Sequence, residues 1–236
     1  MGRDVDKVRK EKRDADIDAF LMKVAATPRV KAAGVKGRLM FALDATASRE
    51  PTWDRACHIQ AEMFTEAAAL GGLEIQVVYF RGFGDFRATP WLSSSDELVR
   101  LMTRVRCLGG HTQIRKVLKH ALAESSGGRK VDALVYVGDC MEEDVDELCH
   151  LAGELGLLGV PAFVFQEGRE PIAMRAFRQI ARLTGGAYCS FDAASAKTLR
   201  ELLRAVAAYA AGGRPALENF SRGAGSEVRL LVSQVK

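Results

Sequence analysis

The segment RLMFALDATAS, residues 38–48, joins an apolar run to a group of oxygen-bearing side chains. The run 38–44 is too short for a buried helix and has almost no polar side chain after its first residue, which is typical of a strand buried on both faces. It stops at Asp44, and Thr46 and Ser48 follow at alternate positions. We therefore expect a buried strand whose end presents a carboxylate and two hydroxyls to one small space.

Similar apolar runs recur along the chain and alternate with segments of helical periodicity. This alternation predicts a doubly wound, mostly parallel six-stranded sheet of the Rossmann-like α/β class, with helices on both faces. Ser94, with Glu97 three residues on, predicts the start of one of these helices as a capping box. Strands are expected at 38–44, 73–80, around Phe86, 133–139, 160–166 and 187–191, and helices at 54–70, 94–105, 113–125, 141–156, 172–186 and 195–211.

The distribution of charge divides the 236 residues into three expected parts. Residues 1–37 read as a charged N-terminal helix (5–26) with a connector, residues 38–211 as the α/β domain, and residues 212–236 as a tail with little periodicity. The net charge of +4 comes from the ends, because residues 39–211 hold 19 basic and 22 acidic side chains. Nucleic-acid binders more often carry a basic stripe on the folded body, so no nucleic-acid partner is expected.

Nothing in the sequence indicates export or membrane insertion. The start MGRDVDKVRK lacks the apolar stretch of a signal peptide, and no run approaches the roughly eighteen apolar residues of a membrane span. We expect a cytoplasmic protein with no membrane partner. The cysteines form no CxxC pair and are odd in number, which favours buried or idle thiols over a structural zinc site. They are Cys57, Cys107, Cys140, Cys149 and Cys189.

Two aspartates end strands that we expect to be neighbours. In open parallel sheets the ligand lies beyond the carboxyl ends of the strands, where the strand order reverses. If the order is 3-2-1-4-5-6, Asp44 and Asp139 face the same crevice. Thr112, which follows two glycines at the start of a helix, can supply another oxygen. Such an all-oxygen site suits Mg²⁺ or Mn²⁺.

These elements resemble the metal-site motifs of von Willebrand factor A-type (VWA) domains. The segment DATAS, 44–48, is similar to the DxSxS motif of that family, and GGHT and VYVGD, ending in Thr112 and Asp139, resemble its second and third elements in the expected order. The resemblance covers roughly residues 38–211. Thr46 stands where the motif usually has its first serine, and its hydroxyl can still bind a metal, although the added methyl group can tighten the site.

The resemblance implies a metal-ion-dependent adhesion site (MIDAS). Thr46, Ser48 and Thr112 would be oxygen ligands of Mg²⁺ or Mn²⁺, and Asp44 and Asp139 would bind it directly or through water. A glutamate or aspartate of a partner protein would complete the octahedron. The chain would then be an adhesion or scaffold module and not an enzyme. The N-terminal helix would pack on the domain, position a partner or mediate self-association.

Each motif also has a purely structural interpretation. Ser and Thr after a strand often cap the next turn, which would explain Thr46 and Ser48. Asp139 would serve as the N-cap of the helix at 141–156. His111 would simply be exposed in its loop. The acidic residues after Asp139 would form a solvated first helical turn at the favourable end of the dipole; they are Glu142, Glu143, Asp144, Asp146 and Glu147.

A magnesium-dependent phosphohydrolase of the haloacid-dehalogenase type is the alternative function. Asp44 would be its nucleophile, and Gly138-Asp139 with Asp144 resembles that family's fourth motif. Most soluble members carry a second aspartate two residues after the nucleophile as the general acid, whereas this chain has Thr46 there. A nucleotide-binding Rossmann domain is less consistent with the sequence, because the glycine fingerprint is missing.

Overall fold

The computed structural model describes residues 36–51, 53, 73–191 and 203–211. The helices expected at 5–26 and 54–70, and the tail from residue 212, lie outside the described residues. So do the first residues of the helix expected at 195–211, of which 203–211 is helical. Among the described helices, none is long and apolar enough to cross a membrane.

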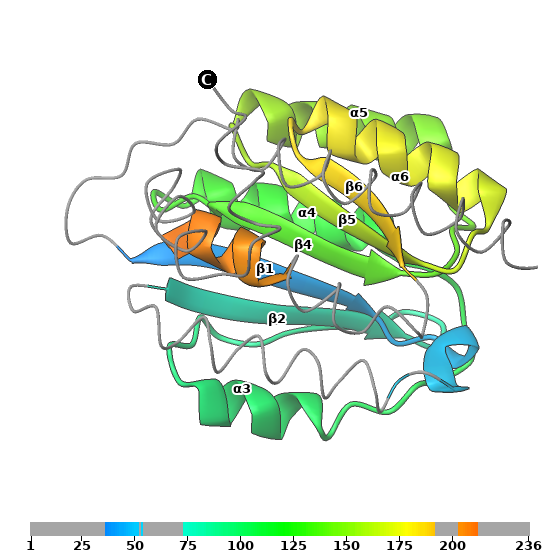
Figure 1. Ribbon diagram of the computed structural model, residues 1–236, viewed down its shortest axis with the longest axis horizontal. Helices are drawn as coiled ribbons and strands as arrows, with labels where there is room; N and C mark the ends of the chain where they lie inside the picture. The colour runs from blue at the N-terminus through cyan, green and yellow to red at the C-terminus, as the bar shows by residue number, and fades with distance from the viewer. Residues whose placement is uncertain (1–35, 52, 54–72, 192–202, 212–236) are drawn as a thin grey trace, which may run out of the picture.

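The sheet has six strands in the order β3-β2-β1-β4-β5-β6. All neighbouring strands pair in parallel except β2 and β3, and the arrowheads of β1, β2, β4 and β5 point the same way in Figure 1. The predicted doubly wound, mostly parallel sheet is therefore confirmed, with one antiparallel edge strand. The strands are β1 (Gly37–Asp44), β2 (Leu73–Arg81), β3 (Asp85–Ala88), β4 (Ala133–Gly138), β5 (Ala162–Glu167) and β6 (Ala187–Phe191).

Helices cover both faces of the sheet, and β1 is buried between them. Alternate side chains of a strand point to opposite faces, so Leu39, Phe41 and Leu43 join one apolar cluster while Met40 and Ala42 join another. The first cluster includes residues of α3 (Ser95–Met102) and of the helical segment 203–211. The second includes residues of α4 (Ile114–Ser126), α5 (Val145–Leu157) and α6 (Pro171–Leu183), of which α5 and α6 run side by side (Figure 1).

Two helix starts test the capping interpretations. Ser94 caps α3 as expected, because its side chain accepts a hydrogen bond from the Glu97 backbone N–H. The helix expected from residue 141 begins at Val145, because Asp144 is the N-cap and accepts from the Glu147 N–H. Asp139 is therefore not a helix cap, and Glu142 and Glu143 do not belong to the first helical turn.

Three loops are fastened together at the carboxyl edge of the sheet. The Leu108 N–H donates to the Ala45 carbonyl oxygen (3.1 Å), and the Gly82 N–H donates to the Leu108 carbonyl oxygen (3.3 Å). A Cβ atom at Gly110 would lie 2.0 Å from the Gly82 carbonyl oxygen, so the two backbones can pack this closely only because residue 110 is glycine. The loop that carries Thr112 is thereby held beside the end of β1.

Gly110→Ala should loosen this loop assembly. The new methyl group meets backbone and cannot be accommodated by a side-chain rotation, so we expect a loss of roughly 1–3 kcal/mol in the free energy of unfolding, measured in urea. The matched control is Gly109→Ala, whose Cβ would have no atom within 4 Å. Equal losses from both variants would contradict the close packing of residues 82 and 110.

Candidate functional site

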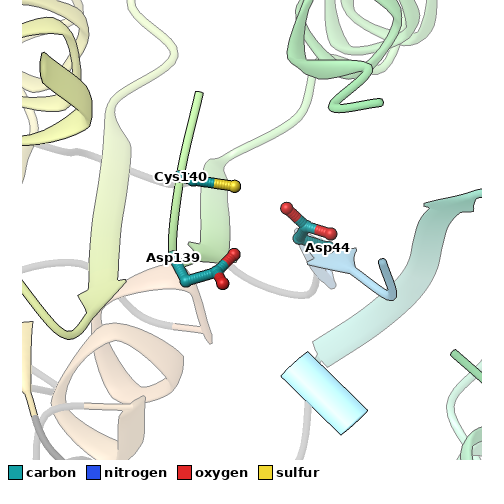
Figure 2. Close-up of side chains that lie close together, drawn as sticks. All are labelled: Asp44, Asp139 and Cys140. Atoms are coloured by element: carbon teal, nitrogen blue, oxygen red, sulfur yellow. The ribbon is translucent and has the colours of Figure 1, made fainter. Parts of the chain in front are cut away.

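Two carboxylates meet where β1 and β4 end. Asp44 is the last residue of β1, and Leu43 pairs with Val137, so Asp139 follows β4 beside it. Figure 2 shows the side chains of Asp44, Asp139 and Cys140 directed toward a common space. A ligand atom from each lies within 4.8 Å of the other two. The structure thus brings Asp44 and Asp139 together, as the predicted strand order requires.

The carboxylate of Asp44 is buried and only half satisfied. Its side chain has no exposed surface, and Oδ1 accepts a hydrogen bond from the Thr46 N–H (2.8 Å). Oδ2 of Asp44 and Oδ1 of Asp139 are also buried, and no described residue donates a hydrogen bond to either. Buried acceptors are rarely left without a donor, and a cation would satisfy both atoms. The residues present therefore fit a divalent metal.

Burial raises the pKa of Asp44 to about 6, because desolvation penalises its charged form. The nearby charge of Asp139 raises it further, whereas the hydrogen bonds from Thr46 and the positive charge of Arg49 lower it. Desolvation is the largest of these effects. Without a cation, the site therefore holds a carboxylate whose ionised form costs free energy.

The two hydroxyls of the DATAS segment lie side by side. Thr46 is buried and Ser48 is exposed, and their Oγ1 and Oγ atoms are 3.1 Å apart. Thr46 precedes the short helix η1 (Ala47–Arg49), but its side chain makes no capping hydrogen bond there. The capping interpretation of Thr46 is therefore wrong for this turn, and its hydroxyl lies beside a second one next to Asp44.

Thr112 is tied to the loop that follows β4. It is buried, its Oγ1 accepts from the Glu142 N–H (3.1 Å), and its own N–H donates to Glu142 Oε2 (3.2 Å). The same carboxylate oxygen lies 2.9 Å from Nδ1 of His111, whose ring is mostly exposed, as expected. These contacts hold Thr112 close to the segment that carries Asp139. The sequence predicts none of these contacts, because Glu142 stands in an acidic run that is typical of a solvated helix start.

Glu143 has a similar bridging role. Its carboxylate accepts from the N–H groups of Ile114 and Arg115 and so caps α4 from another segment. Burial raises the pKa of Glu143, while these hydrogen bonds oppose the shift. Glu143 therefore fixes the start of α4, just after Thr112. A run of acidic residues after a strand aspartate does not predict that one of them caps a helix elsewhere in the chain.

A buried arginine lies beneath the site. The Arg49 side chain has no exposed surface, and its guanidinium contacts Glu167 Oε2 (3.1 Å) at the end of β5. It also donates to the carbonyl oxygens of Val137 (3.2 Å) and Asp44 (3.5 Å). Arg49 thus links the ends of β1, β4 and β5 and supplies a positive charge near the two aspartates. Nothing in the sequence around Arg49 predicts this role, although the residue directly follows Ser48.

Cys140 also belongs to the site, although the sequence indicates only a scattered thiol at this position. The expectation of an idle thiol is wrong for Cys140, because it is half-buried and its sulfur belongs to the cluster with Asp44 and Asp139. Burial and the two carboxylates raise the pKa of this thiol to about 12. Its position directly after Asp139 was the available signal.

Comparison with known proteins relates the chain to others only through its structure. No family model matches the chain, and no curated protein matches it in sequence. Among solved structures, a von Willebrand factor type A protein from Catenulispora acidiphila is 18% identical with a TM-score of 0.60, and the match covers 74% of this chain and 43% of that one.

Two further structures show the same similarity. The SpRpn10 VWA domain is 11% identical, with a TM-score of 0.58, and the match covers 72% of this chain and 94% of that domain. The pilus adhesin SpaC from Lactobacillus rhamnosus GG is 10% identical, with a TM-score of 0.59, and the match covers 80% of this chain and 31% of the adhesin. Identities this low establish the fold alone. The order of the strands, the helices on both faces and these structural neighbours show that the chain has the von Willebrand factor A-type fold.

Proposed function

We propose that this chain is a protein-binding module that captures an acidic group of a partner protein through a divalent metal ion. Asp44, Thr46, Ser48, Thr112 and Asp139 are the proposed ligands, directly or through water, and Mg²⁺ or Mn²⁺ is the expected ion. The fold supports an interaction module, because its neighbours include VWA domains and a pilus adhesin.

The observation that carries the proposal is the pair of buried carboxylate oxygens that no described residue satisfies. Oδ2 of Asp44 and Oδ1 of Asp139 belong to neighbouring side chains at one end of the sheet. Placing two carboxylates together in a buried site costs free energy, and the 0% exposure of Asp44 adds to that cost. A divalent cation would remove the repulsion and satisfy both oxygens.

The neutral hydroxyls in the site support capture of an outside carboxylate. Ligands such as Thr46 and Ser48 donate oxygen without adding negative charge, so a bound ion keeps part of its positive charge. Mg²⁺ also keeps open or water-filled positions in its octahedron. Exchange of one such water for a partner's Glu or Asp would link recognition to the metal.

The surface around the site favours binding of a partner segment in which an acidic group stands next to an apolar one. Phe83, on the β2–β3 turn, is 83% exposed and contacts the ring of His111 edge to face, with 5.3 Å between centroids. Leu108, which forms a bridge with Thr46, is also exposed. An exposed aromatic and an exposed leucine beside a polar site are a common composition for a binding surface.

The burial of Asp44 weighs against the phosphohydrolase alternative. A nucleophilic carboxylate must approach the phosphorus atom in line, and this one has no exposed surface and is held by the Thr46 N–H. Thr46 also lacks the acid–base capacity of the aspartate that the chemistry needs two residues on. Turnover of a generic phosphomonoester remains a direct check.

The first prediction concerns metal binding by the chelator-treated protein. Calorimetric titration with Mg²⁺ or Mn²⁺ should give one saturable site, and Asp139→Asn or Asp44→Asn should weaken it at least ~100-fold because an anionic ligand is lost. The control is Glu154→Gln, which removes a carboxylate on α5 whose partner is the exposed His150. No phosphomonoester hydrolysis should accompany binding. Equal affinity in Asp139→Asn would contradict the site.

The second prediction concerns recognition of the acidic group. Interferometry should detect binding of the protein to peptides with a single exposed Glu or Asp beside an apolar residue when Mg²⁺ or Mn²⁺ is present. The signal should disappear in chelator, in the Asp139→Asn variant and with peptides carrying Gln or Asn instead. Binding of the Glu and Gln peptides with the same affinity would rule out capture through a carboxylate.

The third prediction concerns stability without metal. The folded-state pKa of Asp44, about 6, lies above its ordinary value of 3.8. The contribution of this carboxyl group to the free energy of unfolding is therefore most favourable below pH 4 and is lost as the pH rises through 6. In chelator at pH 7, Asp44→Asn should therefore be more stable than the wild type by about 2–3 kcal/mol in urea unfolding. The difference should vanish near pH 4.

Saturating Mn²⁺ should reverse that order, because only the wild type retains the anionic ligand and gains stability from binding. Glu154→Gln should follow the wild type at every pH. An Asp44→Asn variant less stable than the wild type in chelator at pH 7 would show that the ionised carboxylate is not a source of strain.

A further inference from the structure

The thiol of Cys140 lies inside the carboxylate cluster. Its sulfur is within 4.8 Å of an oxygen of Asp44 and of one of Asp139, and Figure 2 shows it on the side facing Asp44. Cys149, a half-buried thiol on α5, is placed differently, because it donates to Gln179 Oε1 (3.0 Å). Cys140 therefore adds a sulfur ligand atom to a group of oxygens.

Oxygen and sulfur ligands select different metals. Mg²⁺ binds oxygen almost exclusively and has little affinity for thiolate, whereas Zn²⁺ and Co²⁺ readily accept mixed carboxylate and thiolate sets. A sulfur beside two carboxylates therefore adds little to the affinity for a hard ion and much to the affinity for a borderline ion. The ligand set changes the expected preference of the site.

We propose that Cys140 is a metal ligand and that Asp44, Asp139 and Cys140 together bind a divalent transition metal of the zinc class in preference to Mg²⁺. This inference rests on the proposed function and names the metal of that same site. On binding, the sulfur–hydrogen bond of Cys140 breaks, its proton passes to solvent and a sulfur–metal bond forms, with no change in oxidation state. These three are the direct protein ligands, and the hydroxyls of Thr46, Ser48 and Thr112 would interact through water, so that a fourth position is left for the partner's carboxylate.

The distances are consistent with such a centre after a small contraction. With zinc–sulfur and zinc–oxygen bonds of about 2.3 and 2.1 Å, tetrahedral ligand atoms lie roughly 3.5 Å apart. Atoms within 4.8 Å of one another therefore need to approach by at most about 1.3 Å. The second observation that points to a cation is Oδ2 of Asp44, which belongs to a fully buried side chain and receives no hydrogen bond from the described residues.

Cobalt spectroscopy tests the sulfur ligand directly. Addition of Co²⁺ to the reduced, full-length protein should produce a near-ultraviolet sulfur-to-cobalt charge-transfer band that saturates at one equivalent. The band should be absent in Cys140→Ser, which keeps an oxygen at this position, and unchanged in Cys149→Ser. An equal band in Cys140→Ser would overturn the proposal, because the sulfur would then come from another residue.

A competition experiment tests the preference. In the wild type, Zn²⁺ should displace Mn²⁺ and should bind at least ~100-fold more tightly than Mg²⁺, and Cys140→Ser should weaken Zn²⁺ at least ~10-fold while leaving Mg²⁺ affinity within about threefold. If Mg²⁺, Mn²⁺ and Co²⁺ bind in an Asp44-dependent manner but without the charge-transfer band, this inference fails and the proposed function stands. If no metal binding depends on Asp44, both fail.

Discussion

The rest of the site depends on one constraint: the Asp44 carboxylate is confined beside Asp139, and the described residues supply too few donors to satisfy both. Asp44 ends a strand that is buried on both faces, so its side chain emerges where water has no access. The parallel pairing of β1 with β4 then places the second aspartate next to it. A protein interior normally avoids such a pair, because desolvation and mutual repulsion both disfavour the ionised forms.

The surrounding segments hold this pair in place and do not relieve it. Arg49 neutralises part of the charge, yet its guanidinium is shared among Glu167 and the backbone at the ends of β1 and β4. Glu142 joins the Thr112 loop to the segment after β4, and the close packing of Gly110 on Gly82 fixes the same loop from the other side. The result is a preorganised group of oxygen atoms with unsatisfied charge, which is the condition for binding a cation without large rearrangement.

The fold could be predicted in outline because it depends on local patterns. Apolar runs such as 133–139 and the helices between them indicate a parallel sheet, and the order of its strands follows from the ordinary topology of that class. The proximity of Asp44 and Asp139 then follows from topology alone. The additional contacts of the site could not be read in this way, because they join residues about thirty or more positions apart through loops.

Glu142 illustrates the difference. Its sequence neighbours are acids at what looks like a helix start, and only the late beginning of α5 at Val145 leaves its side chain able to reach His111 and Thr112. The burial of Arg49 could not be predicted either, because a charged residue after a loop motif is exposed by default. Its burial depends on the ion pair with Glu167, which belongs to a strand distant in the sequence. For Cys140 the sequence gives only its position directly after Asp139, and the structure adds that its side chain points toward Asp44.

The central claim is that a divalent ion lies between Asp44 and Asp139, and a crystal structure of the protein grown with Mn²⁺ tests it most directly. An anomalous difference map should show one peak within bonding distance of the Asp44 and Asp139 carboxylates, with oxygens of the 46–48 segment or of Thr112 turned toward it. A map with no peak at this end of the sheet, and with both carboxylates in their metal-free positions, would contradict the claim.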